Sequence, residues 1–187
     1  KDANWKGKDS QYFILPRVKI KHGSRDYSGV RTKSAKQLPL KPWLKFFGFW
    51  LAEGWTTNGK DGDYNVCVSN SNQFLLDEMN NLLREFGYIP YKNNKVVRVR
   101  DYQLYHYLKQ FGKASEKFIP LEVKVLSKEL LGVLFEYYIK GDGHVHGRNK
   151  KGLSATTIST LLRDDLQEIA LKMGISAYYK LKYKKGR

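Results

Sequence analysis

Two short apolar stretches, each ending in a small residue, an acid and a glycine, constrain this chain more than any other feature. They are residues 46–54, ending in Ala52-Glu53-Gly54, and residues 135–143, ending in Gly141-Asp142-Gly143. Pro42 suits the first turn of a helix, and Ser127 is a good N-cap. Glycine directly after such a run usually ends a helix. The sequence therefore predicts two buried helices, over 43–54 and 127–142, each with a carboxylate at its C-terminal end.

An acid at the C-terminal end of a helix is unfavourable, because that end carries partial negative charge and the repulsion costs roughly 0.3–1 kcal/mol. Here the arrangement occurs twice in matched contexts. If the two helices pack in parallel, Glu53 and Asp142 come together, and neighbouring carboxylates need a cation or a proton to coexist. Oxygen ligands of this kind suit Mg²⁺. The alternative for each acid is a carboxylate that binds only local backbone amides.

The charge of the chain indicates a polyanionic partner. Thirty-four Lys and Arg residues against 18 Asp and Glu give a formal net charge of +16, so nucleic acid is the first candidate. The alternative is a ribosomal-type or merely soluble basic protein. Cys67 is the only cysteine, which excludes a disulfide and a cysteine zinc site. No apolar run is long enough for a membrane span and no signal peptide is visible, so we expect an intracellular protein.

The order helix, strand, helix, strand occurs twice along the chain. Gly54 and Gly143 are 89 residues apart, and Gly87 and Gly174, which follow two amphipathic helices, are 87 apart. At the second offset, apolar positions coincide: Leu75 with Leu162, Met79 with Leu166, and Leu82 with Ile169. The pattern predicts a duplication. The first half alone continues to a connector with Lys117, whose counterpart would fall near position 204, so we expect a shortened second half or part of a longer protein.

Local patterns predict the remaining elements and three regions: a basic N-terminal arm over 1–40, a first half over 41–126 and a second half over 127–187. In the arm, residues 17–21 alternate like a strand with one basic face, and a mobile basic loop follows. The other predictions are turn residues over 55–63, strands over 64–69, 88–91, 95–102 and 178–183, and helices over 72–86, 102–111 and 158–173.

With these features together, the chain resembles the LAGLIDADG (dodecapeptide) homing endonucleases, and most of all the intein-borne members. Residues 46–54 match the nine-residue family motif in its A-E-G form, and residues 135–143 match its G-D-G form. The stretch Lys117-Phe118-Ile119-Pro120 is similar to the K-x-I-P element of the family. The opening residues 5–16 look like the segment that leads from an intein splicing domain into its endonuclease. Tyr137 replaces the usual third-position glycine, which predicts a wider or shifted crossing of the two helices.

The resemblance implies a mixed α+β fold. Two pseudo-twofold-related αββαββα-type halves would pack through the motif helices, and antiparallel sheets would form a DNA-binding saddle. It implies a monomer that makes a double-strand break at a long, specific site in duplex DNA. By resemblance, Glu53 and Asp142 bind Mg²⁺ or Mn²⁺, the carbonyls of Ala52 and Gly141 complete the metal shell, and Lys117 supports charge at the reacting phosphate.

Basic residues on predicted strands and turns are the candidates for DNA contact. In the resemblance the strand faces lie on the duplex, where Lys and Arg contact phosphates or base edges. The candidates are Arg17, Lys19, Lys95, Arg98, Arg100, Arg148, Lys150, Lys180 and Lys182. The alternative function is a catalytically silent protein of the same fold that binds DNA or assists RNA splicing as a maturase.

Overall fold

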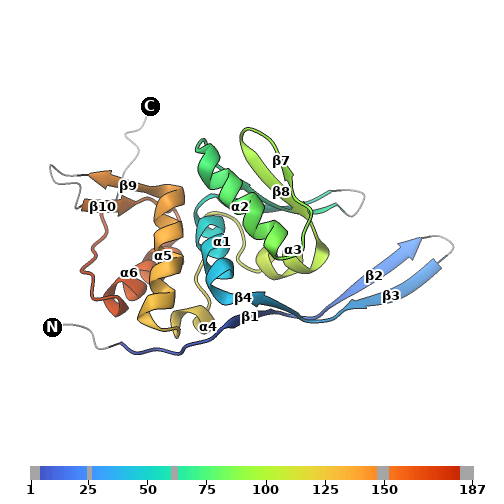
Figure 1. Ribbon diagram of the computed structural model, residues 1–187, viewed down its shortest axis with the longest axis horizontal. Helices are drawn as coiled ribbons and strands as arrows, with labels where there is room; N and C mark the ends of the chain where they lie inside the picture. The colour runs from blue at the N-terminus through green and yellow to red at the C-terminus, as the bar shows by residue number, and fades with distance from the viewer. Residues whose placement is uncertain (1–4, 25–26, 60–62, 147–151, 182–187) are drawn as a thin grey trace.

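Two long helices lie side by side at the centre of the molecule (Figure 1). They are α1 (Leu40–Glu53) and α5 (Lys128–Asp142), close to the predicted ranges. A computed structural model describes residues 5–24, 27–59, 63–146 and 152–181. The core around α1 is aromatic. Trp43 stacks on Phe13 with ring centroids 4.3 Å apart, and within the helix Phe47 stacks on both Trp43 and Trp50. Burial of these large side chains holds the two helices in the centre of the fold.

The first half has the order α1-β5-β6-α2-β7-β8-α3, which is the predicted αββαββα pattern. Its further elements are β5 (Gly54–Asn58), β6 (Tyr64–Ser69), α2 (Gln73–Glu85), β7 (Tyr91–Lys92), β8 (Val96–Arg100) and α3 (Tyr102–Lys109). The four strands form one antiparallel sheet in the order β5-β6-β8-β7. The prediction of turn residues over 55–63 is wrong for 55–58, because β5 pairs along its whole length with β6.

The two faces of this sheet differ in character. Four valines of β6 and β8 are buried in the core beneath α1, α2 and α3: Val66, Val68, Val97 and Val99. On the opposite face, Trp55, Cys67, Arg98 and Tyr91 are neighbours in register across the four strands. This face carries the arginines of β8, both exposed, and is called the outer face below.

The second half follows the connector. It comprises α5, β9 (Gly143–His146), β10 (Gly152–Ala155) and α6 (Thr160–Lys172), with a short helix α4 (Leu121–Lys124) before α5. β9 and β10 pair with each other as an antiparallel hairpin. The predicted strand over 178–183 is wrong for its described part, since residues 175–181 form no strand and instead lie along α6, where Gln167 bonds the Ala177 carbonyl.

The N-terminal region forms two strand pairs. β1 (Tyr12–Leu15) pairs with β4 (Lys36–Pro39), and Phe13, Leu15 and Leu38 are buried in the core. Between them, β2 (Val18–Ser24) and β3 (Tyr27–Lys33) form an antiparallel ribbon that projects away from the two central helices (Figure 1). The basic stretch predicted as a loop is therefore largely strand, because seven residues on each side pair across the hairpin.

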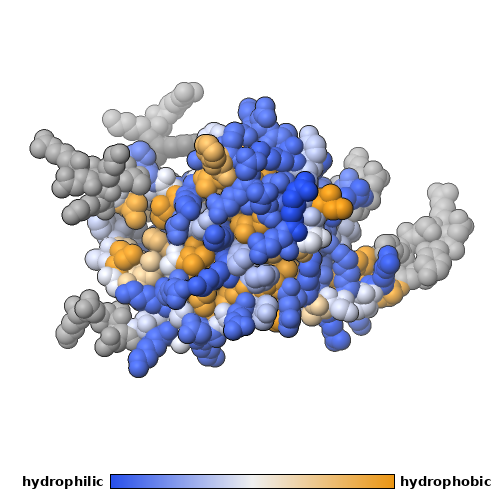
Figure 2. Space-filling model, viewed as in Figure 1, coloured by the Kyte–Doolittle hydropathy of each residue, from blue (hydrophilic) through white to orange (hydrophobic). Residues whose placement is uncertain are grey.

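Hydrophilic residues cover most of the face shown in Figure 2, and hydrophobic residues emerge in scattered patches. This distribution agrees with the large excess of Lys and Arg in the chain. Within the described ranges, no helix has the length and apolar character needed to cross a bilayer.

Candidate active site

The two central helices end in the same way. The N–H of Gly54 bonds the carbonyl of Trp50, and the N–H of Gly143 bonds the carbonyl of Ile139. Both glycines are extended, with φ/ψ of −98°/157° and −87°/155°, and each begins a strand directly. Glu53 and Asp142 therefore occupy equivalent positions, each the last residue of its helix.

Small residues let the two helices approach closely at this end. A Cβ on Gly141 would lie 2.6 Å from the Cβ of Ala52 and 3.2 Å from the Cγ of Glu53. Farther down the helices, a Cβ on Gly48 would lie 2.3 Å from the Leu134 carbonyl oxygen. Neither position has room for a side chain unless the Leu134 backbone or the Ala52 side chain is displaced. The contact at Gly141 brings the two acidic helix ends together.

Tyr137, the departure from the family motif, does not prevent this approach. Its hydroxyl donates a hydrogen bond to Glu78 of α2, and the ammonium groups of Lys45 and Lys140 lie 5.3 Å and 4.1 Å from the ring centroid. The ring thus points away from the α1–α5 contact and toward α2. The predicted widening of the helix crossing is wrong at Gly48, which packs directly against the Leu134 backbone.

The two carboxyl groups are close enough to affect each other. Burial raises the pKa of Glu53, the nearby Asp142 raises it further, and Lys117 opposes both effects. Burial also raises the pKa of Asp142, again opposed by Lys117. Asn70, which follows β6, directs its amide toward Glu53 with Nδ2 3.5 Å from Oε1. Both pKa values stay raised despite Lys117, so this one ammonium only partly compensates two ionised carboxylates.

Lys117 lies beneath the end of α1. Its Nζ donates to the carbonyl oxygens of Trp50 (2.9 Å), Leu51 (2.9 Å) and Gly54 (2.8 Å). A lysine ammonium has three donors, so these carbonyls use all of them. The side chain is buried, and burial lowers its pKa to about 8 against the opposing effects of Asp142 and Glu53. Lys117 thus bonds carbonyls at the end of α1, and it adds positive charge beside the acids.

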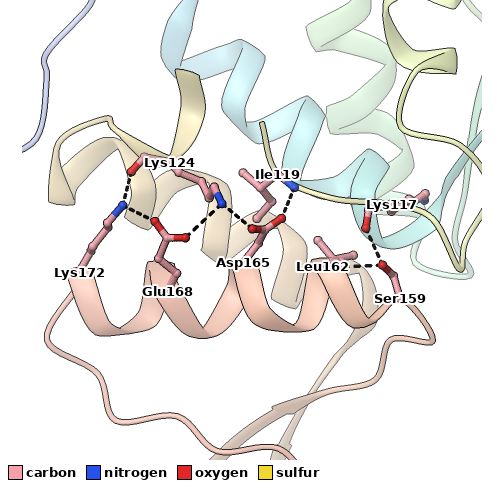
Figure 3. Close-up of polar contacts among 8 residues, drawn as sticks. All are labelled: Lys117, Ile119, Lys124, Ser159, Leu162, Asp165, Glu168 and Lys172. Atoms are coloured by element: carbon pink, nitrogen blue, oxygen red, sulfur yellow. Dashed lines mark hydrogen bonds and ion pairs between the residues drawn. The ribbon is translucent and has the colours of Figure 1, made fainter. Parts of the chain in front are cut away.

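The connector that carries Lys117 is held by a helix of the second half (Figure 3). Ser159, the N-cap of α6, accepts a bond from the Leu162 N–H (3.1 Å) and donates from Oγ to the Lys117 carbonyl (2.6 Å). Nearly two turns farther along α6, Asp165 accepts a bond from the Ile119 N–H at 2.7 Å. The second half therefore fixes the backbone of a residue that serves the end of the first-half helix.

Asp165 also joins a wider network on the same helix. Lys124 of α4 lies 2.7 Å from Asp165 and 3.1 Å from Glu168, and Lys172 lies 2.5 Å from Glu168 (Figure 3). Lys172 also donates to the Lys124 carbonyl at 2.8 Å. These contacts tie α6 to the segment between the two halves.

Sequence reasoning did not find Asn70, Ser159 or Asp165. Asp165 had a usable signal, because it shares the buried stripe of α6 with Leu162 and Ile169, and an acid on an apolar stripe needs a partner. Ser159 precedes an apolar run, which is the pattern of an N-cap. The contact of Asn70 with Glu53 spans 17 residues and has no such local signal.

The structure places three of the predicted DNA-contacting residues on or beside the outer face. Arg98 and Arg100 project from β8; Arg98 lies 5.1 Å from the Tyr91 ring centroid, and Arg100 pairs with Asp63. Lys95 is exposed in the turn between β7 and β8. The arrangement provides exposed positive charge along one strand of the sheet.

The other predicted contacts are dispersed. Arg17 and Lys19 are exposed at the base of the β2–β3 ribbon. Lys180 is exposed in the segment that lies along α6, away from any strand. Arg148, Lys150 and Lys182 lie outside the described residues.

The donor set at the helix ends suits one kind of metal site. Among the described residues, no group of three or more His, Cys, Asp or Glu side chains could hold an ion, so a closed protein cage is absent there. Two carboxylates with raised pKa values and adjacent backbone carbonyls remain. Mg²⁺ is commonly bound by one or two carboxylates, with water and substrate phosphate as its other ligands. The residues present fit such an open site.

Comparison with known proteins identifies both repeats. A family model described as a LAGLIDADG-like domain matches residues 44–120 and 129–187. Solved structures of I-DmoI have the same fold: the complex with DNA and Mn aligns with a TM-score of 0.56 at 13% identity, covering 77% of this chain and 84% of that one. The complex with DNA and Ca aligns with a TM-score of 0.53 at 14% identity, covering 73% and 74%.

Curated relatives are larger proteins with diverse names. An ATP-dependent Clp protease proteolytic subunit of Chlamydomonas moewusii is 26% identical over 96% of this chain, and an RNA polymerase subunit beta C-terminal section of Stigeoclonium helveticum is 28% identical over all of it. A DNA polymerase II large subunit of Thermococcus kodakarensis is 29% identical over 76% of the chain. The chain spans only 18%, 20% and 8% of the lengths of these three relatives.

Proposed function

The chain belongs to the LAGLIDADG-like domain family, and on this basis we propose that it is a site-specific, metal-dependent DNA endonuclease. The observation that carries the proposal is the pair of acids at matched helix ends, Glu53 and Asp142, which Gly141 and Ala52 bring together. Acids held this way are unfavourable for stability, because burial raises both pKa values and the charge of Asp142 raises that of Glu53 further. Binding of divalent cations offsets that cost.

Glu53 and Asp142 would hold Mg²⁺ or Mn²⁺, with the carbonyls of Ala52 and Gly141 as additional oxygen ligands. The I-DmoI structures contain DNA together with Mn or Ca, which supports a divalent ion for this fold. A bound ion of this kind can activate water at neutral pH and stabilise a leaving oxygen in phosphodiester hydrolysis. One acid from each repeat gives each DNA strand its own carboxylate.

Lys117 acts on this site from below. Its three hydrogen bonds fix the last turn of α1 and so position the carboxylate of Glu53. With a pKa of about 8 the ammonium is mostly protonated at neutral pH, so it contributes positive charge beside the acids and toward a bound phosphate. Direct contact with the phosphate would require Lys117 to release one of the three carbonyls.

DNA would lie across the outer face of the sheet. Arg98, Arg100 and Lys95 supply cations there, and an antiparallel sheet with exposed arginines can contact phosphates and base edges. The two repeats in one chain favour a monomer that presents both acids at once. Lys180, exposed in the segment along α6, would add a contact on the second-half side.

The curated relatives support an intein origin. A protease subunit, an RNA polymerase subunit and a DNA polymerase share no activity by name, yet in each of these relatives the match with this chain covers a small part of the relative's own length. A segment inserted independently into unrelated host genes explains that pattern. We therefore propose that the chain is the endonuclease region of an intein, acting inside the cell on DNA.

The test is cleavage of a plasmid library with a randomised 30-bp cassette, incubated with Mg²⁺ or Mn²⁺ and sequenced for linearised members. Enrichment of one related set of sequences is expected with the unaltered chain, and EDTA should abolish it. Asp142→Asn should abolish cleavage while binding to the selected duplex is retained. Glu136→Gln, an exposed acid on the same helix, is the matched control and should cleave normally. Cleavage by Asp142→Asn would contradict the assignment.

A second candidate function is DNA or RNA binding without cleavage, as in a maturase. It is favoured by an asymmetry of the site, since Lys117 serves the end of α1 and no lysine is recorded at the carbonyls ending α5 within the described ranges. Binding to duplex DNA with no strand cleavage in Mg²⁺ or Mn²⁺ would select this alternative.

A further inference from the structure

The β2–β3 ribbon belongs neither to the four-stranded sheet nor to the acidic site. Seven residue pairs in register join its strands, from Val18 with Lys33 to Ser24 with Tyr27. At about 3.4 Å per residue, seven residues extend roughly 20 Å. Figure 1 shows the ribbon projecting away from the two central helices, on the side of the four-stranded sheet.

The base of the ribbon is fixed to the first half. Gln103 of α3 donates from Nε2 to the carbonyls of Pro16 (2.8 Å) and Ser34 (2.9 Å), one on each side of the hairpin. Lys33 pairs with Asp101 at 2.5 Å, and Asp101 is the N-cap of the same helix. A two-stranded hairpin alone is marginally stable, so these contacts give it a defined direction.

This base lies at the end of the sheet that is distant from the acids. β5 starts at Gly54 beside Glu53 and runs outward to Asn58, which pairs with Tyr64. β8 also ends outward, at Arg100, and the next residue, Asp101, bonds the Tyr64 carbonyl through its N–H. The ribbon therefore starts where the sheet ends and continues beyond it.

Positive charge lies on both faces of the ribbon. Residues opposite each other in the register share a face, so Lys19 lies with Thr32 on one face and Arg31 lies with Ile20 on the other. Both are exposed, and none of the ion pairs among the described residues involves either. Residues 18–33 include five Lys or Arg and one acid. A flat partner surface would meet only one of these faces.

We propose that the β2–β3 ribbon is a second DNA-binding arm that inserts into a groove beyond the outer end of the sheet. This rests on the proposed function, in which DNA lies on the outer face. The major groove, about 12 Å wide, admits a two-stranded ribbon, and its walls place phosphates on both sides. A ribbon of roughly 20 Å spans about six base pairs at 3.4 Å each. The recognised sequence would therefore extend farther on the first-half side than on the second.

Site-specific photocrosslinking separates this proposal from the proposed function. Benzoylphenylalanine replaces one of three similarly exposed residues: Val30 on the ribbon (63% exposed), Tyr91 on the outer face (56%) or Leu121 on α4 (69%). Leu121 precedes α5 and so lies a helix length, roughly 22 Å, from its acidic end. Each variant is irradiated with a labelled 40-bp duplex of mixed sequence at 150 mM salt.

Crosslinks from positions 30 and 91, with none from 121, are the expected result. A crosslink from 91 without one from 30 overturns the ribbon proposal and leaves DNA binding by the sheet intact. A crosslink from 30 alone supports the ribbon and contradicts the placement of DNA on the outer face. Equal crosslinking from 30 and 121, or none from any position, overturns the proposal.

A charge variant gives an independent measurement on the same duplex. Lys19→Ala combined with Arg31→Ala should make the slope of log affinity against log salt shallower by roughly 2, because two phosphate contacts are lost. Lys109→Ala combined with Lys113→Ala removes the same charge from exposed positions at the far end of α3 and should leave the slope unchanged. Equal effects of the two double variants would show that only net charge matters, which contradicts a ribbon contact.

Discussion

The end of α5 touches the end of α1 through Gly141 and Ala52: a Cβ on Gly141 would lie 2.6 Å from the Cβ of Ala52. Such a distance is too short for two methyl groups, so only glycine allows this approach. Because Asp142 and Glu53 are the next residues along each helix, the same contact sets the separation of the two carboxylates.

Gly141→Ala should therefore separate the acids. We expect destabilisation of about 1–3 kcal/mol from overpacking, and a loss of cleavage larger than the loss of DNA affinity. Gly132→Ala, on the same helix, is the matched control: its Cβ would meet only the Met173 methyl at 3.9 Å. That change should stabilise the protein by about 0.5–1 kcal/mol. Denaturant unfolding and cleavage assays measure both; equal behaviour of the two variants would contradict the close contact.

Lys117→Met should weaken the end of α1. The variant leaves the buried carbonyls of Trp50, Leu51 and Gly54 without their shared donor, which should cost at least about 2 kcal/mol of unfolding free energy. Lys113→Met, on an exposed turn of the same connector, should change stability by less than about 0.5 kcal/mol. Urea denaturation measures the difference, and similar values for the two variants would rule out the role of Lys117 at the helix end.

The stability contribution of Lys117 should also depend on pH. Burial lowers its pKa from 10.5 to about 8, so protonation is harder in the folded state than in the unfolded state. The free-energy cost of keeping Lys117 protonated in the folded state is full below pH 8 and disappears as pH rises toward 10.5. The unfolding free energy of the unaltered protein, minus that of Lys117→Met, should rise by up to about 3 kcal/mol between these values. A difference that stays level or falls across this window would contradict the lowered pKa.

Divalent cations should stabilise the protein through the two acids. Burial raises the pKa of both, so each ionised carboxyl destabilises the metal-free fold as pH rises through its folded-state pKa. Mg²⁺ or Ca²⁺ should raise the melting temperature at pH 7.5 and have less effect at pH 5, where protons compete. Asp142→Asn should raise the metal-free melting temperature and remove most of the ion-dependent increase. A full ion-dependent increase in that variant would place the ion elsewhere.

Two adjacent acids of α6 allow a test of the contact between the halves. Asp165 is buried and bonds the Ile119 N–H, whereas Asp164 is largely exposed and pairs with its neighbour Arg163. Asp165→Asn should cost about 1–3 kcal/mol, because an amide cannot accept from both Ile119 and Lys124. It should also reduce cleavage, since Lys117 is on the same connector. Asp164→Asn should match the unaltered protein in both assays; equal losses would indicate a general effect of charge.

Sequence patterns predict the helices of this fold and strand β8 well, because their signals are local. The apolar stripe of α2 and the glycine after it depend on nearby residues alone, and so does the alternation of Val97 and Val99 in β8. β5 was missed because Thr56 and Asn58 have turn-like composition, and pairing with β6 overrides it. In the β2–β3 ribbon, the strand predicted over 17–21 is confirmed by β2, but β3 was not predicted, since Gly23 and Gly29 indicate a loop.

In the candidate site, too, the features with local sequence signals were predicted and those that depend on long-range contacts were not. The motif places Glu53 and Asp142 at helix ends from sequence alone, but the hydrogen bonds that position Lys117 join residues 63 to 67 positions apart. Ser159 and Asp165 reach the connector across 42 and 46 residues. Long-range contacts of this kind leave no periodic signal, so they became visible only in three dimensions.

The hold of α6 on the Lys117 connector has a consequence for engineering. Exchange of whole repeats between related proteins is an obvious route to hybrid specificities, because each repeat contributes one motif helix. In this chain, a swapped second repeat lacking equivalents of Ser159 and Asp165 would release the backbone that orients Lys117 at the other repeat. A functional hybrid must therefore transplant those two side chains, or move the crossover point to the near side of residue 117.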